Sequence, residues 1–233
     1  MELEKVGSRI LSWPAQDKYV HKPFGGRKQG MEERRDFLRN SSDWTWFLAF
    51  SVIIGFFSIP IHELGHVLGY RLLGIPATMS YAREILPPGQ PERFLGVAGG
   101  PLFTQLICCA ALLLIYCRKW LVVAFPLAVI MSLDRIILYG IDWRRLLVQH
   151  RVPGMDETKM ATLLGLNPFF WYAAFTLFFI LAWILILYSL RFGVLRNIAL
   201  CAVPMIFFMA MAAFGVFVVE RHLFPEQFRI QFG

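Results

Sequence analysis

The chain has 233 residues, of which 57% are apolar and only 17% charged, and its mean hydropathy is +0.56. This composition excludes an ordinary soluble globular domain and predicts a multi-pass integral membrane protein, with the lipid bilayer as its solvent. The net charge is +7, but the first 43 residues combine nine cations with seven acids. We therefore expect no nucleic-acid partner, and we expect residues 1–43 to form a polar extension ahead of a transmembrane domain at 44–233.

Five stretches are long and apolar enough to cross about 30 Å of hydrocarbon. They run from Trp44 to about Gly74, Phe94 to Cys117, Trp120 to about Trp143, Phe169 to Leu190 and Asn197 to Val219. The segment Ile75–Arg93 is too rich in proline for a helix, so we expect an irregular or hairpin segment at or within the membrane. The predicted fold class is thus an all-α polytopic membrane protein with about five transmembrane helices.

The first predicted span contains the pattern His62-Glu63-Leu64-Gly65-His66. Two histidines four residues apart share one face of a helix, so both imidazoles can reach one Zn²⁺ ion. Glu63 is then placed to accept a proton from a water at the metal. An ionisable group inside a span costs on the order of 3 kcal/mol if nothing compensates it, and a metal site is such a compensation. Hydrogen bonds to neighbouring helices, with Glu63 neutral or paired to an arginine, are the alternative.

A catalytic zinc site needs a third protein ligand and an open position, and three aspartates are candidates for that ligand. Asp134 lies within the third span, where a carboxylate requires a partner. Asp142 lies near the end of the same span, and Asp156 precedes a short helical pattern that ends at Leu166. Depth in the membrane alone ranks Asp134 first.

The runs HELGHVLGYRLLGIP (62–76) and AGGP (98–101) resemble the intramembrane zinc metalloproteases of the site-2 protease class, peptidase family M50. The resemblance covers about residues 44–190. It implies a zinc-protease core of three helices: the HExxH helix first, a helix with a Gly-Pro motif second, and an aspartate from a third region. The segment around Asp156 resembles the family's Pro-x-x-Leu-Asp-Gly element, especially in its short M50B-like members, although Glu157 stands where glycine is usual. The resemblance therefore favours Asp156 over Asp134 as the third ligand.

The family's second motif usually reads Gly-Pro-x-x-Asn, and its asparagine helps to hold the substrate. Here the motif is Gly100-Pro101-Leu102-Phe103-Thr104, so the resemblance implies substrate positioning by Gly100, Pro101 and Thr104. Thr104, or its neighbour Gln105, would supply the polar group in place of asparagine. A helix start with close packing explains the glycines and proline equally well.

The function expected from these residues is hydrolysis of peptide bonds in transmembrane protein substrates. His62, His66 and Asp156 would bind Zn²⁺, and Glu63 would act as general base. A non-proteolytic, metal-binding scaffold or chaperone with the same fold is the alternative, but a structural zinc site needs no base. A transporter is a third reading, which the absence of repeated halves in the sequence disfavours.

Overall fold

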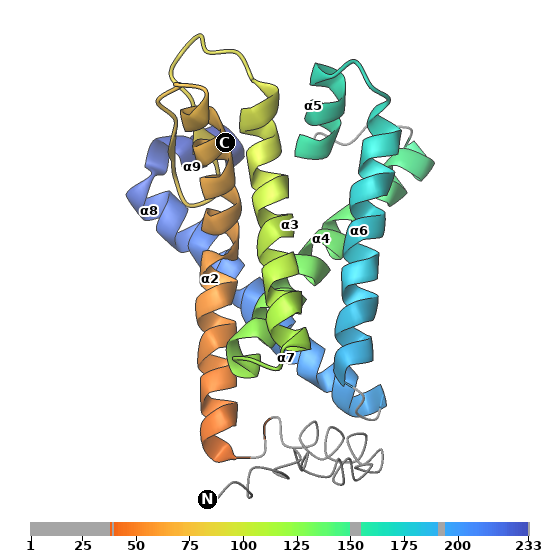
Figure 1. Ribbon diagram of the computed structural model, residues 1–233. Coiled ribbons are helices and arrows are strands. Elements are labelled where there is room, and N and C mark those ends of the chain that lie inside the picture. The colour runs from red at the N-terminus through yellow and green to blue at the C-terminus, as the bar shows by residue number, and fades with distance from the viewer. Residues whose placement is uncertain (1–37, 39, 150–154, 191–193, 233) are drawn as a thin grey trace, which may run out of the picture.

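The computed structural model describes residue 38 and residues 40–149, 155–190 and 194–232. Within them the chain is almost entirely helical (Figure 1). The elements are α2 (Ser41–Leu72), β1 (Thr78–Met79), β2 (Glu84–Ile85), α3 (Phe94–Tyr116), α4 (Leu121–Gln149), α5 (Asp156–Leu163), α6 (Pro168–Leu190), α7 (Val194–Phe214), the π-helix η1 (Gly215–Glu220), α8 (Arg221–Leu223) and α9 (Pro225–Phe232). The predicted N-terminal extension lies almost wholly outside the described residues.

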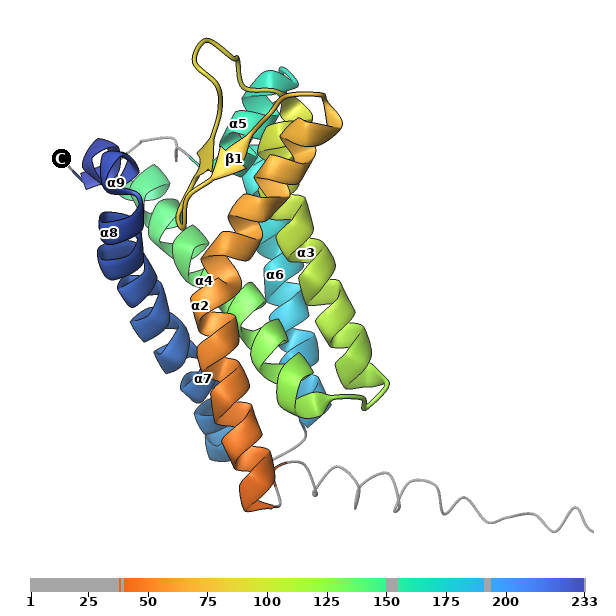
Figure 2. The same ribbon diagram turned by 90° about the vertical axis from the view of Figure 1, so that its left-hand side faces the viewer.

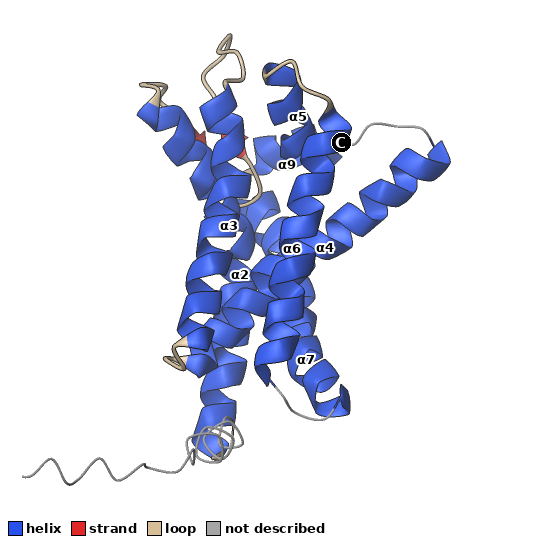
Figure 3. Ribbon diagram, turned by 45° about the vertical axis from the view of Figure 1, so that its right-hand side comes forward, coloured by secondary structure: helices blue, strands red, loops and turns tan. Residues whose placement is uncertain are grey.

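Among the described residues five helices are long and apolar enough to span a membrane, which agrees with the predicted number of spans. The third helix continues to Gln149, past the expected end at Trp143. The fifth span continues through η1 and α8 to Leu223, beyond the expected Val219. Figure 3 shows that the last turns of α4 lean away from the other helices, so its charged end leaves the bundle core. The charged residues of the sequence show where each apolar run stops, but the backbone hydrogen bonds of the helix continue beyond that point.

The tightest helix contact is the crossing of α2 and α3, which lie side by side (Figures 1 and 2). Glycines of both helices face one another there. A Cβ atom at Gly65 would lie 2.5 Å from the carbonyl oxygen of Gly99, and one at Gly69 would overlap the backbone of Leu95. Small residues let transmembrane helices approach closely. This crossing brings the backbone of α3 against the HExxH face of α2.

A short hairpin follows α2, as the proline-rich connector predicted. Its two strands pair antiparallel, with Thr78 opposite Ile85 and Met79 opposite Glu84. The Nε–H group of Arg71 donates to the carbonyl oxygen of Ala77 at 3.1 Å, which ties the start of the hairpin to the end of α2. Figure 2 shows the hairpin beside the upper half of α2.

The turn of this hairpin is anchored by Tyr81. Pro60 has no N–H group, so the Phe56 carbonyl oxygen loses its helical donor. The hydroxyl of Tyr81 donates to that oxygen at 2.7 Å. The backbone N–H of Tyr81 donates to the buried carboxylate of Glu220 at 2.8 Å, and the tyrosine ring fills the space that a Cβ at Gly215 would need. The hairpin therefore links the Phe56–Pro60 turn of α2, immediately before His62, to the π-helix of the last span.

Candidate metal centre

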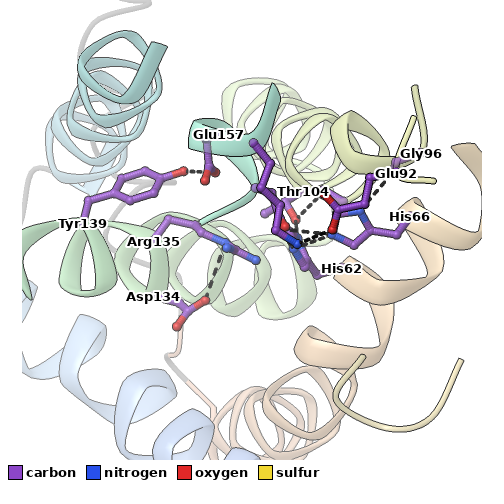
Figure 4. A network of polar contacts seen from close by, with 12 residues as sticks. His62, His66, Glu92, Gly96, Thr104, Asp134, Arg135, Tyr139 and Glu157 are labelled. Carbon is purple, nitrogen blue, oxygen red and sulfur yellow. Dashed lines mark hydrogen bonds and ion pairs between the residues drawn. The ribbon is translucent and has the colours of Figure 1, made fainter. Parts of the chain in front are cut away.

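Residues from α2, α3 and α5 meet in one polar cluster (Figure 4). The Nε2 atoms of His62 and His66 lie 3.2 Å apart, and the Oδ2 atom of Asp156 lies 3.2 Å from each of them. Both histidines are buried, and Asp156 is partly buried at the start of α5. The three ligand atoms therefore form a nearly equilateral triangle.

The size of this triangle suits a tetrahedral metal ion. Zinc bonds of about 2.0–2.1 Å to nitrogen and oxygen place neighbouring ligand atoms of a tetrahedron about 3.3 Å apart. The observed separation is 3.2 Å for all three pairs. Two imidazoles and one carboxylate also match the His₂-carboxylate ligand set of catalytic zinc sites, which leaves the fourth position open. The residues present thus fit a zinc ion.

The tautomer of His66 is set by the backbone of α3. Its Nδ1 atom lies 2.9 Å from the carbonyl oxygen of Gly96. A carbonyl can only accept a hydrogen bond, so Nδ1 carries the hydrogen and the neutral ring presents a lone pair at Nε2. The ring also packs directly on Gly100, where a Cβ atom would overlap it. His66 is therefore held in the orientation and tautomer that a metal ligand needs.

Asp156 reaches this position because α5 folds back against α3 and α6. The hydroxyl of Tyr139, on α4, donates to the carboxylate of the fully buried Glu157, and Lys159 forms an ion pair with Glu92 at 2.8 Å. Burial favours a raised pKa for Asp156, but its contacts with both imidazoles hold the pKa below the ordinary value. It is therefore a carboxylate, the form that binds metals.

Glu157, which stands where the resembling family usually has glycine, forms a buried contact with Tyr139. The side chain points away from the three ligands and toward Tyr139 (Figure 4). Burial raises the pKa of Glu157, while the nearby Arg135 guanidinium acts in the opposite direction. The extra carboxylate therefore fastens α5 to α4.

The other two aspartates lie elsewhere. The carboxylate of Asp134 is 3.8 Å from the guanidinium of Arg135, and that of Asp142 accepts a hydrogen bond of 3.1 Å from Arg145. Neither belongs to a group that could hold a metal ion within the described chain. The structure thus brings Asp156, and neither of its rivals, to the two histidines. Its role as third ligand remains a prediction.

The candidate base and the second motif also lie at this centre. Glu63 is buried, and its Oε2 atom has no hydrogen-bond partner among the described residues. Gly100 and Pro101 are buried in α3, and Thr104 is buried with its hydroxyl 2.9 Å from Nδ1 of His62. Thr104 thus contacts a candidate ligand, whereas the resemblance had implied a contact with substrate.

One neighbour of the site was missed in the sequence. Glu84, on β2, places a carboxylate oxygen within 4.8 Å of ligand atoms of both Glu63 and His66. It lies 18 residues beyond the HExxH motif, in a segment expected to be a connector, and nothing in its local pattern marks it. Only the hairpin brings it back to α2.

Comparison of the chain with protein-family models, with curated proteins and with solved structures finds no match.

Proposed function

We propose that this chain is an intramembrane zinc metalloprotease that resembles the site-2 protease class and has its three-helix core in α2, α3 and α4 with α5. The observation that carries the proposal is the triangle of His62, His66 and Asp156 ligand atoms, with 3.2 Å edges, directly beside Glu63. A structural zinc site would need a fourth protein ligand and no base. Three ligands with an adjacent carboxylate favour catalysis.

In this proposal His62, His66 and Asp156 hold Zn²⁺, which when bound acidifies a water molecule and polarises a carbonyl group. Glu63 supplies the proton transfers. Its buried Oε2 atom has a free lone pair, so it can accept a proton as the water oxygen bonds to the scissile carbon. When the carbon–nitrogen bond breaks, Glu63 returns that proton to the leaving amine. The products are one carboxylic acid, which keeps the second proton of the water, and one amine, as hydrolysis requires.

The proposed substrates are transmembrane segments of other proteins, because the metal centre lies on helices that can span the membrane. A helical substrate must unwind locally before its backbone can be attacked. The sheet of the hairpin has only two strands, so each strand keeps an unpaired edge. An extended substrate segment can add to such an edge by main-chain hydrogen bonds. Since Glu84 on β2 lies beside Glu63, an added strand would run close to the proposed base.

The test is Glu63→Gln, which keeps the shape of the side chain and removes its ability to accept a proton. We expect purified Glu63→Gln to retain the zinc content of the wild type and to lose cleavage of transmembrane substrates in proteoliposomes, by about 10²-fold or more. Asp134→Asn is the control, because Asp134 is also a carboxylate inside a span but pairs with Arg135 and belongs to no candidate metal group among the described residues.

Three outcomes separate the alternatives. Full cleavage by Glu63→Gln would exclude the proposed mechanism. A wild-type protein that binds zinc but cleaves nothing across a library of transmembrane segments would favour a metal-binding scaffold. Loss of zinc in Glu63→Gln would make Glu63 a ligand.

A further inference from the structure

Thr104 lies on α3 with its side chain against His62 (Figure 4). Its hydroxyl oxygen is 2.9 Å from Nδ1 of His62 and 3.0 Å from the carbonyl oxygen of Gly100, one turn earlier in the same helix. The residue is only 2% exposed, so no solvent replaces either contact. Thr104 is therefore part of the surroundings of one proposed ligand.

The two histidines differ in how their second nitrogen is satisfied. For His66 the partner is a backbone carbonyl, which no substitution removes. For His62 it is a hydroxyl, which can donate or accept. The carbonyl of Gly100 can take the hydroxyl hydrogen, which leaves an oxygen lone pair directed at Nδ1. Thr104 can thus accept a hydrogen bond from His62 whenever that ring carries its hydrogen on Nδ1.

A metal ion at Nε2 requires this state. An imidazole that binds a metal through Nε2 keeps its hydrogen on Nδ1, and that N–H group needs an acceptor when it is buried. Within the described chain the Thr104 hydroxyl is the group within hydrogen-bond distance of Nδ1. Without it the N–H group would be buried and unpaired in the metal-bound protein, although the metal-free ring could move its hydrogen to Nε2 and donate to Asp156.

We propose that Thr104 is a positioning residue that holds His62 in the tautomer and orientation needed to bind the metal. This inference rests on the proposed metal site. It assigns to Thr104 a role different from that of the asparagine at the corresponding position of the family motif, because its hydroxyl faces a ligand histidine. The cost of losing the hydroxyl falls on the metal-bound state and much less on the metal-free fold.

The test measures Zn²⁺ affinity of the detergent-purified chain by competition with a chromogenic chelator. Thr104→Val replaces the hydroxyl with a methyl group of similar size, and we expect affinity to fall by about 10- to 100-fold. Thr104→Ser keeps the hydroxyl and should restore affinity to near the wild-type value. The absorption spectrum of bound Co²⁺ should change in Thr104→Val and be recovered in Thr104→Ser.

The chain offers a closely matched control at Thr176. Its hydroxyl donates to the carbonyl oxygen of Tyr172 at 2.8 Å and accepts from the indole N–H of Trp143 at 3.1 Å, the same pair of bonds in another helix. Thr176→Val therefore removes equivalent hydrogen bonds away from the metal ligands. We expect it to keep wild-type Zn²⁺ affinity.

Several results would overturn the inference. Thr104→Val with wild-type affinity would show that the hydroxyl does not support His62. Equal losses in Thr104→Val and Thr176→Val, or failure of Thr104→Ser to restore affinity, would indicate general packing. If Thr104→Val does not fold, Thr104→Ala takes its place. The inference then requires Thr104→Ala to bind Zn²⁺ more weakly than Thr104→Ser, and equal affinities would overturn it. A wild-type chain that binds no Zn²⁺ would instead refute the proposed metal site itself, and the inference with it.

Discussion

Substitution of Gly99 by alanine tests whether the close crossing of α2 and α3 builds the metal centre. The added Cβ atom would lie 2.1 Å from the carbonyl oxygen of Gly65, 2.7 Å from its carbonyl carbon and 3.1 Å from Cα of His66. Carbon and oxygen atoms in contact are about 3.3 Å apart, so the helices must separate by about 1.2 Å. Backbone atoms, and no flexible side chain, form all three contacts. The helices themselves must therefore move.

This separation acts directly on the histidines, because α2 carries them and α3 carries their partners. The bond from His66 to the Gly96 carbonyl is 2.9 Å long, and a shift of this size takes it beyond hydrogen-bonding distance. Overpacking of this kind costs about 1–3 kcal/mol. We expect Gly99→Ala to lower the free energy of unfolding by about that amount. We also expect it to weaken Zn²⁺ binding by at least about tenfold, because the hydrogen bond that orients His66 is lost.

The assay combines thermal unfolding in detergent, followed by circular dichroism, with Zn²⁺ titration. Gly140→Ala is the control, because a Cβ atom there meets no other atom within 4 Å in the middle of α4. It should be neutral or stabilising by about 0.5–1 kcal/mol. If Gly99→Ala melts and binds Zn²⁺ like the wild type, the close crossing does not determine the geometry of the site.

Asp156→Asn should reduce Zn²⁺ binding by at least about 100-fold, whereas Asp134→Asn should leave the zinc stoichiometry unchanged, since only Asp156 contacts the histidines; the reverse result would exchange their roles. Tyr81→Phe should lower the free energy of unfolding by about 1–3 kcal/mol, because the Phe56 carbonyl oxygen loses its donor. In a Pro60→Ala background a backbone N–H group returns to the Phe56 carbonyl oxygen, so a double-mutant cycle should show a smaller cost for Tyr81→Phe. An unchanged cost would show that Tyr81 does not replace the donor that Pro60 lacks. Burial raises the pKa of Tyr81 to about 12, so its contribution to stability should be complete below pH 10 and decline as the pH rises toward 12. Melting temperatures of wild type and Tyr81→Phe at pH 9 to 12 should therefore converge, and a constant difference would oppose this reasoning.

Much of the fold follows from local sequence, because crossing a membrane imposes a length and a composition on each helix. The five spans were predictable on this basis. The proline content of the connector predicted an irregular or hairpin segment, and the structure shows a hairpin. The ends of the third and fifth helices were not, since a helix can continue after its apolar run ends. The π-helix at Gly215–Glu220 was not predicted either, and its first residue packs against the ring of Tyr81, which lies far away in the chain.

Two pairs of glycines in the sequence also correspond to a close helix contact in the structure. Gly65 and Gly69 on one helix, and Gly96 and Gly100 on the next, each form the small-xxx-small pattern of closely packed membrane helices. The structure places these glycines at the crossing of α2 and α3. The pattern predicts close approach but cannot say which two helices meet.

The sequence by itself determined the pair of histidines and the glutamate between them, because a helix places residues i and i+4 on one face whatever surrounds it. Tertiary structure decides which aspartate lies beside them, because depth in the membrane ranked Asp134 first and only the family resemblance favoured Asp156. Asp134 is nearer in the chain, but its helix turns it toward Arg135, while Asp156, 90 residues from His66, is carried back by the packing of α5 and the bond from Tyr139 to Glu157. The positions of Thr104 and Glu84 beside the site depend in the same way on a helix crossing and a hairpin. Contacts between distant segments depend on how whole helices and strands pack, and the spacing of residues within one segment does not predict that packing.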